Sequence, residues 1–291
     1  MAALVSQVEF PENFQALFSA WNRFPEAEIF AGGNEFMRKQ GRRFPLLPQN
    51  LISLDKMTEL QKISRTERYL EIGSMVRLNQ IAQLGKIVPE ALNLCIENVA
   101  GTHIRNVATT GGNICNSNRR FDLSAPMFAL DAQFELRSAT SSKWISATRF
   151  LSPIGPPALA AHEILTRIRV PLEPWTYTWF YKFSCTNLDD PGGCILFMIR
   201  TQKKTLSKIR VVYAGKAILR EKNCETMFEG KNLPLNKNQA GIFVDKWKSY
   251  LSTFVGNENS IYPGEDDNFS GELAKNRILN FIETKLHHIS D

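Results

Sequence analysis

Residues 109–116, Thr109-Thr110-Gly111-Gly112-Asn113-Ile114-Cys115-Asn116, place two adjacent glycines between hydroxyl and amide side chains. Glycine has no Cβ, so its backbone can adopt positive φ and a ligand can come close to its N–H group. Successive N–H groups that turn inward form an anion-binding nest, and Thr and Asn side chains add neutral hydrogen-bond donors. The stretch therefore predicts a phosphate-binding loop, with a tight β-turn between strands as the alternative.

A second segment, Ala31-Gly32-Gly33-Asn34-Glu35-Phe36, repeats this chemistry near the start of the chain. A short buried-strand pattern at residues 28–31 runs directly into it. One Gly-Gly turn says little about function, but two in one apolar domain indicate a pyrophosphate held between them. The spacing does not fit a dinucleotide-binding Rossmann unit, because no G-x-G-x-x-G opens a long helix.

The composition is that of an ordinary folded protein, with 291 residues of which 43% are hydrophobic and 22% charged. This length predicts two domains. The net charge of +6 comes from scattered residues rather than a basic stripe interleaved with aromatics, so we expect no nucleic-acid binding. The N-terminus lacks a signal-peptide pattern and no apolar run approaches the ~18 residues of a membrane span, so we expect no membrane contact and a cytoplasmic location.

The five cysteines are odd in number and never form C-x-x-C, which argues against a disulfide framework and against a self-contained zinc or iron–sulfur site. Cys115 is expected to pack within its loop rather than to carry redox chemistry. His103 has no partners at metal-ligand spacing, so we expect no metal site.

Hydrophobic periodicity predicts a first domain of residues 1–172 and a second domain of residues 173–291. In the first domain we expect helices at 14–21, 78–84, 89–99 and after Asp122, and strands at 28–31, 69–73, 134–138, 144–146 and 164–171. In the second, strands at 195–200 and 209–214 are joined by a turn at 202–204, and helices follow at 238–254 and 270–286. The aromatic cluster at 175–183 is expected in the core or at a subunit interface.

The run Arg105-Asn106-Val107-Ala108-Thr109-Thr110-Gly111-Gly112-Asn113-Ile114-Cys115, taken with the first glycine segment and with Asp122-Leu123, resembles the FAD-binding medium subunits of molybdenum hydroxylases. That family includes the flavin subunits of xanthine dehydrogenase, nicotinate dehydrogenase and carbon monoxide dehydrogenase. The resemblance extends over nearly the whole chain, through residues 130–132, 164–165 and 181–182 and more weakly through 214–215 and 225–231. It implies an α+β fold: a two-lobed FAD-binding domain of the PCMH (vanillyl-alcohol oxidase-like) type, with lobes of about 1–55 and 56–172, then a C-terminal domain with a three-stranded antiparallel sheet and helices.

The resemblance also implies which residues hold FAD. The first glycine segment binds the pyrophosphate through its backbone, the second segment lies opposite, and Leu165 lies against the isoalloxazine. The full set of implied cofactor contacts is Ile29, Phe30, Ala31, Gly32, Gly33, Asn34, Glu35, Val99, Ala108, Thr109, Gly111, Gly112, Asn113, Asn116, Asp122, Leu165 and Lys182.

Several of these residues have ordinary structural alternatives. Asp122 matches the family's acidic contact, but it would equally serve as the N-cap of the following helix. Lys182 matches the basic residue that reaches the flavin from the second domain, but it would equally be a solvated strand residue. Arg119 and Arg120 depart from the family's usual Pro-containing segment, and they either approach the flavin or form a solvated loop tip. Residues 184–195 diverge as well.

The function implied by the resemblance is electron transfer through bound FAD, with no catalytic side chain and no metal on this chain. The partners would be a [2Fe–2S] small subunit, which supplies electrons, and a molybdopterin-binding large subunit, and NAD or another acceptor would receive them. Two alternatives stay open: a stand-alone flavin oxidoreductase of the same fold, and a flavin-free scaffold whose loops bind another anion.

Overall fold

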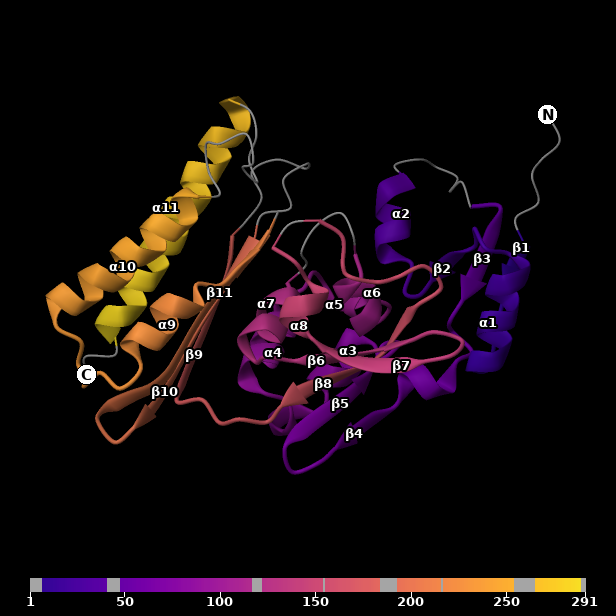
Figure 1. Ribbon diagram of the computed structural model, residues 1–291, viewed down its shortest axis with the longest axis horizontal. Helices are drawn as coiled ribbons and strands as arrows, with labels where there is room; N and C mark the ends of the chain where they lie inside the picture. Colours follow the sequence, from indigo (N-terminus) through magenta and orange to yellow (C-terminus); the bar gives the residue numbers. More distant parts are fainter. Residues whose placement is uncertain are drawn as a thin grey trace.

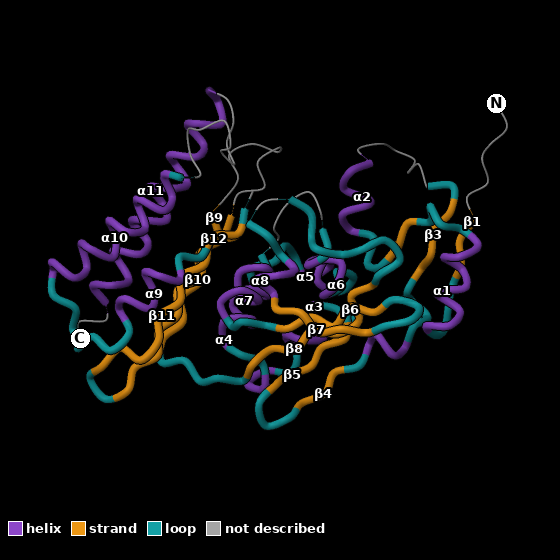
Figure 2. The backbone as a smooth tube through the Cα atoms, in the orientation of Figure 1, coloured by secondary structure: helices purple, strands orange, loops and turns teal. Residues whose placement is uncertain are grey.

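The computed structural model describes residues 7–40, 48–116, 122–153, 155–183, 193–215, 217–253 and 265–288. Three sheets follow one another along the long axis of the molecule (Figure 1). We refer to them, with their helices, as the first lobe, the second lobe and the C-terminal domain. An extended linker, residues 172–176, joins the last two (Figure 2).

The first lobe is a small parallel sheet in the order β1-β3-β2, made of β1 (Gln7–Glu9), β3 (Asn50–Ser53) and β2 (Glu28–Phe30). Helix α1 (Phe14–Arg23) begins where the Asn13 side chain accepts a hydrogen bond from the Ala16 N–H at 2.9 Å. Its apolar face, which includes Leu17 and Trp21, is buried in a core separate from that of the second lobe. A bend after β2 leads into the short helix α2 (Asn34–Gln40), so the first glycine segment lies at the end of this sheet.

The second lobe has a five-stranded antiparallel sheet in the order β4-β5-β8-β6-β7. Its strands are β4 (Ile63–Arg65), β5 (Tyr69–Gly73), β8 (Ile164–Pro171), β6 (Gln133–Arg137) and β7 (Ser142–Ser146). Six helices pack over one face in Figure 1: α3 (Leu78–Ala82), α4 (Glu90–Glu97), α5 (Thr102–Arg105), α6 (Thr110–Ile114), α7 (Ser124–Ala129) and α8 (Ala147–Phe150). The 3₁₀ turn η1 (Thr58–Gln61) lies between β3 and β4, and η2 (Gly85–Ile87) connects α3 to α4.

The C-terminal domain has an antiparallel sheet in the order β12-β11-β10-β9, with β12 (Ile218–Leu219), β11 (Thr205–Ala214), β10 (Gly193–Gln202) and β9 (Tyr177–Phe183). The sheet thus has four strands rather than three, because the chain turns back after β11 and adds the two-residue β12. The predicted hairpin is confirmed, with Lys203 in its turn at φ +57°. Helices α9 (Lys222–Phe228), α10 (Lys237–Ser252) and α11 (Glu265–His288) cover one face, and α4 and α7 pack against the other.

A buried ion pair ties the C-terminal domain to the second lobe. Arg220 is 4% exposed and donates hydrogen bonds to the Glu225 carboxylate at 2.9 Å. It also donates to the Phe128 carbonyl and to Asp131 Oδ1, both at 2.7 Å and both at the end of α7. Burial raises the pKa of Glu225, although the charges of Arg220 and Arg210 oppose that effect. One side chain therefore satisfies groups on both sides of the domain boundary.

The uncovered face of the second-lobe sheet contains a carboxylate whose protonation controls stability. Glu135 accepts hydrogen bonds from Arg167 Nε and Nη2, both at 2.7 Å, and from Thr166 Oγ1 at 2.5 Å. The Arg167 hydrogen bonds, with help from Thr166, lower the pKa of Glu135 to about 2, although partial burial opposes the shift. The stability that this carboxylate contributes is therefore present above its unfolded pKa of about 4.3 and is lost as the pH falls towards 2.

Replacing Glu135 with glutamine is expected to lower the free energy of unfolding at pH 7 by about 1–2 kcal/mol, after allowance for solvent screening at the partly exposed Arg167. The difference between wild type and variant should shrink between about pH 5 and pH 2. Urea denaturation at several pH values measures it, and Glu59→Gln, at an exposed position on the same lobe, is the control. A difference that persists unchanged at the lowest pH would contradict this account.

Candidate functional site

A cleft of about 730 Å³ with mostly apolar walls lies between the first and second lobes. It is lined by Trp21, Pro25, Glu26, Ile29, Ala31 and Leu54 of the first lobe and by Ser74, Met75, Gly111, Gly112, Cys115, Asn116 and residues 159–165 of the second. Six of the expected cofactor contacts thus share one cleft: Ile29, Ala31, Gly111, Gly112, Asn116 and Leu165.

A smaller hollow of about 230 Å³ adjoins the same segments and is lined by Gly32 and Thr109, among others. Ala31 and Met75 line both spaces. The first glycine segment therefore stands between a large apolar cleft and a small polar hollow, an arrangement that suits a long ligand whose two ends differ in polarity.

The structure brings the two glycine segments into contact. A Cβ built on Gly32 would lie 2.3 Å from the Val107 carbonyl oxygen, and one built on Gly112 would lie 3.8 Å from the Ala31 Cβ. The Asn34 amide also donates to the Ile104 carbonyl at 3.4 Å. Gly32 is thus required because no side chain fits between the first lobe and the second.

The first segment supplies free backbone donors. Gly33 has φ +71°, a conformation that favours glycine, and a Cβ there would lie 2.6 Å from the Phe30 ring. Within the described residues, no acceptor pairs with the N–H groups of Gly32, Gly33 and Asn34. Three consecutive unpaired N–H groups form the kind of nest that binds phosphate oxygens.

The second segment differs from the expected nest. Residues 110–114 form the short helix α6, and the Thr109 side chain caps it by accepting from the Gly112 N–H at 3.1 Å. The N–H groups of Thr110 and Gly111 donate to the Val76 and Ser74 carbonyls at 2.9 and 2.7 Å. The prediction that this segment offers successive backbone donors is therefore wrong, because its packing against the end of β5 already uses them.

Two side-chain oxygens, one in the second segment and one in the neighbouring residue Ser74, have no partner. Asn113 Oδ1 and Ser74 Oγ are buried, and nothing in the described ranges forms a hydrogen bond with either atom. An unpaired buried polar atom costs about 1–3 kcal/mol, so a native structure normally supplies a partner. As an acceptor, Asn113 Oδ1 suits a ligand hydroxyl rather than a phosphate oxygen.

Lys182 reaches from β9 of the C-terminal domain to the second lobe. Its Nζ donates to the Asp122 carboxylate and, at 3.0 Å, to the Asn98 carbonyl at the end of α4. Lys182 is therefore not a solvated strand residue. Asp122 is not the N-cap of α7 either, because Leu123 occupies that position. The structure thus pairs the two charged residues expected at the flavin.

Arg105 fixes the turn that follows α4. Its guanidinium donates to the carbonyls of Ala100 at 2.6 Å, Val99 at 3.0 Å and Glu97 at 3.3 Å. It also donates to Thr102 Oγ1 at 3.2 Å. Ala100 has φ +41°, so this cation holds a turn that a non-glycine residue adopts only with strain. The turn contains Val99, an expected flavin contact, and lies next to the carbonyl that binds Lys182.

Replacing Arg105 with methionine is expected to lower the free energy of unfolding by about 2–3 kcal/mol, because the variant loses charge-assisted hydrogen bonds to three carbonyls. Arg105→Lys should recover only part of this, since an ammonium lacks the planar fork that contacts several acceptors. Thermal and denaturant unfolding measure the effect, with Arg149→Met at an exposed position as the control. Equal stability of Arg105→Met and the control would contradict the role.

Cys115, which lines the cleft, behaves as a packing residue. Burial raises the pKa of its thiol to about 12, so it is not a thiolate at neutral pH.

At the far end of the cleft, the His162 ring packs 5.4 Å from that of Trp21, and its Nε2 lies 3.3 Å from the Pro25 carbonyl. His162 has φ +55°. Contacts across the cleft thus hold the loop at 159–163 against α1.

Some expected residues lie elsewhere or outside the description. Those that line neither space are Phe30, Gly33, Asn34, Glu35, Val99, Ala108, Asn113, Asp122 and Lys182. Of these, Val99 is only 8% exposed and packs in the second-lobe core. Arg119, Arg120 and residues 184–192 fall outside the described residues.

Sequence reasoning assigned no role to Ser74, Asn98, Arg105 and His162. Arg105 carried a signal, because it is the charged residue of the string that bears the resemblance. The roles of Asn98 and Ser74 depend on a backbone carbonyl and on a long-range contact, and no local pattern encodes either.

In the part of the chain that the structure describes, no helix is long and apolar enough to cross a bilayer.

Known proteins resemble this chain in sequence and in fold. A sequence model of the family described as FAD binding domain in molybdopterin dehydrogenase matches residues 4–173. Xanthine dehydrogenase 2 of Arabidopsis thaliana is 29% identical over 304 aligned residues, which cover 97% of this chain and 22% of that enzyme. The xanthine dehydrogenase FAD-binding subunit of Escherichia coli O157:H7 is 26% identical, with 73% of this chain and 74% of that subunit aligned. The chain thus spans about a fifth of the plant enzyme.

Solved structures extend the likeness to the whole fold. A chain of quinoline 2-oxidoreductase from Pseudomonas putida 86 superimposes with a TM-score of 0.79 at 19% identity, and 99% of each chain is covered. A chain of carbon monoxide dehydrogenase from Hydrogenophaga pseudoflava gives 0.81 at 20% identity, with 98% of this chain and 96% of that chain covered. At these identities the likeness concerns the fold, and it includes the C-terminal domain.

Proposed function

Because the chain belongs to the family of FAD-binding domains of molybdopterin dehydrogenases, we propose that it is the flavin-carrying, electron-transferring subunit of a molybdenum hydroxylase of the xanthine dehydrogenase type. The observation that carries this proposal is the contact between the two glycine segments: the first has unpaired N–H groups at Gly32, Gly33 and Asn34, and Ala31 beside them lines a cleft large enough for a cofactor.

The polar groups of the site fit FAD. The unpaired N–H groups of Gly32, Gly33 and Asn34 would hold the pyrophosphate, because neutral donors bind the phosphate charge without burying lysines. Asn113 Oδ1 and Ser74 Oγ lack partners, and sugar or ribityl hydroxyls would provide them. The apolar cleft that contains Ile29 and Leu165 would enclose a flat ring system.

When bound, FAD supplies one-electron and two-electron redox chemistry, and the chain supplies position and electrostatics. Lys182 places a cation beside Asp122, an expected cofactor contact, where it would favour negative charge on a neighbouring group. The Asp122 carboxylate and the Asn98 carbonyl fix the position of the Lys182 ammonium, so this group would reorganise little when the charge of a bound flavin changes.

The visible spectrum of the purified full-length chain after reconstitution with FAD tests the proposal. We expect stoichiometric bound flavin and a rise in the unfolding temperature, because a ligand that binds only the folded state stabilises it. No bound flavin and no thermal shift would rule the proposal out in favour of the flavin-free scaffold.

We further propose that the chain takes electrons from the [2Fe–2S] clusters of a small subunit, works beside a molybdopterin-binding large subunit, and passes electrons to NAD or another acceptor. The family supports this, since it is defined on domains of molybdopterin dehydrogenases. Affinity purification from the native source tests it by the co-purifying subunits and their iron and molybdenum content. A flavin-loaded monomer with its own turnover would instead favour the stand-alone oxidoreductase.

A further inference from the structure

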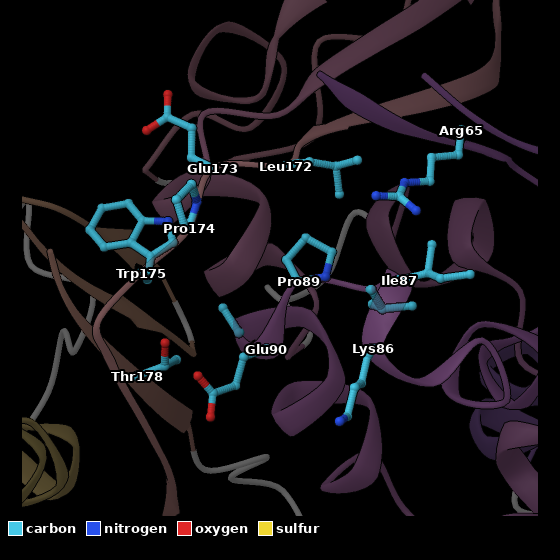
Figure 3. Close-up of a pocket in the computed structure, with 12 residues that line it drawn as sticks. Arg65, Lys86, Ile87, Pro89, Glu90, Leu172, Glu173, Pro174, Trp175 and Thr178 are labelled. Atoms are coloured by element: carbon cyan, nitrogen blue, oxygen red, sulfur yellow. The ribbon is translucent and has the colours of Figure 1, made fainter. Parts of the chain in front are cut away.

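A second pocket, of about 390 Å³, lies beside the linker between the second lobe and the C-terminal domain (Figure 3). The end of β4, the chain from η2 into α4, the linker and β9 form its walls. None of the expected flavin contacts lines it. Its volume falls within the range of about 300–1,000 Å³ that is usual for small-molecule sites.

Two buried polar atoms of this pocket have no partner. Trp175 Nε1 and Thr178 Oγ1 are buried, and neither forms a hydrogen bond within the described ranges. The indole N–H can only donate, so it needs an acceptor atom, and the hydroxyl can donate as well. In Figure 3 the two side chains lie on the same side of the pocket. Two adjacent donors without acceptors indicate a ligand that brings the acceptors.

The charged residues favour an anion. Arg65 lies on the opposite side of the pocket in Figure 3 and Lys86 at its lower edge; both residues are exposed, and neither forms an ion pair with any part of the chain that is described. Glu173 does not compete for them, because Lys208 at 2.7 Å and Arg200 at 3.3 Å hold its carboxylate. Glu90 adds one exposed carboxylate against the two cations.

The remaining walls are flat and apolar. The Trp175 indole and the rings of Pro174 and Pro89 border the space between the donors and the cations (Figure 3). The indole is flat and stacks with aromatic ligands, and the saturated proline rings add apolar contact. We propose that the pocket binds a small organic anion, a flat ring bearing a carboxylate or phosphate group that contacts Arg65 and Lys86 while acceptor atoms on the ligand meet Trp175 and Thr178.

Calorimetric titration of the full-length, FAD-loaded chain tests the proposal with three probes. Benzoate combines ring and charge, benzyl alcohol has the ring alone, and inorganic phosphate has the charge alone. We expect benzoate to bind at least about tenfold more tightly than either of the others. If benzyl alcohol binds as tightly, the anion requirement is wrong; if phosphate does, the ring requirement is wrong. No heat from any probe at about 10 mM would overturn the whole proposal.

Variants locate the site. Benzoate affinity should fall about tenfold in the double variant Arg65→Gln/Lys86→Gln and about fivefold in Thr178→Val, which keeps the shape of the pocket and removes a donor. Trp175→Phe removes the other donor together with part of the ring surface and should lower the affinity at least as much. Lys222→Gln, an exposed cation of α9, is the control and should not change it. Unchanged affinity in all three site variants would place the binding elsewhere and overturn the proposal.

The substitution Thr178→Val can also be tested without a ligand, by its effect on the unfolding temperature. Thr178→Val removes a buried hydroxyl that has no partner, so the probe-free protein should unfold at the same or a higher temperature than wild type. Thr176→Val, by contrast, removes the acceptor of the Thr201 N–H at 2.9 Å and should lower that temperature. A lower temperature for Thr178→Val would show that the hydroxyl already has a partner and would overturn its role. Because this pocket shares no residue with the flavin site, its failure leaves the proposed function untouched.

Discussion

Gly32→Ala is expected to lose FAD binding and to destabilise the contact between the first two lobes. The added Cβ would lie 2.3 Å from the Val107 carbonyl oxygen, far inside any real contact, and the atom it meets is backbone. Either the first segment or residues 104–108 must move. Overpacking of this kind typically costs about 1–3 kcal/mol, and it also displaces the N–H groups proposed to hold the pyrophosphate.

Flavin absorbance of the reconstituted variant and its unfolding temperature measure the two parts of this effect. Gly241→Ala, within α10, is the matched control, because no atom lies within 4 Å of the added Cβ. It should retain FAD and gain up to about 1 kcal/mol from the better helix propensity of alanine. If Gly32→Ala binds FAD as wild type does, the first segment is not part of the cofactor site.

Arg220→Met is expected to cost about 3 kcal/mol of stability, because it leaves the Glu225 carboxylate buried at 2% exposure with Arg210 at 3.4 Å and the Val211 N–H at 3.1 Å as its partners. It also removes the donor to the Phe128 carbonyl across the domain boundary. Burial raises the pKa of Glu225, so in the variant the carboxyl is tolerated when protonated and destabilises the fold once ionised. The loss should therefore be smaller at low pH and grow as the pH rises.

A double-mutant cycle separates this explanation from simple loss of packing. Adding Glu225→Gln to Arg220→Met removes the unpaired charge and should restore part of the lost stability, so the two substitutions should not be additive. Arg200→Met, which removes a more exposed pair with Glu173, should cost less than about 1 kcal/mol. Additive effects with no dependence on pH would contradict the ion-pair account.

The parts of this fold that follow from local pattern were predictable from the sequence. The β10–β11 hairpin has an apolar run on either side of a polar turn, and the structure places the turn at residues 203–204. Helices α10 and α11 were predicted from their 3.6-residue period, with ends that shift by a few residues. The predicted family and α+β fold are confirmed. The division near residue 172 stays our proposal.

What could not be predicted depends on contacts between distant residues. Gly111-Gly112 has poor helix propensity, yet it forms part of α6 because the Ser74 carbonyl accepts from the Gly111 N–H and the Thr109 hydroxyl accepts from the Gly112 N–H. Likewise, nothing local distinguishes Lys182 from a solvated strand lysine, since its partners lie 60 and 84 residues away in the chain. The seventeen expected cofactor contacts stay predictions, although the structure gathers six of them in one cleft.

The Lys182 contact has a consequence for how the two ends of the molecule communicate. The C-terminal domain offers one ammonium to the expected flavin site, and that same group is bound by the second lobe. If FAD binding strengthens this docking by some factor, thermodynamic reciprocity requires that docking strengthen FAD binding by the same factor. A protein that binds the C-terminal helices and changes the orientation of their domain would then alter the affinity for the cofactor from a distance, without contacting either glycine segment.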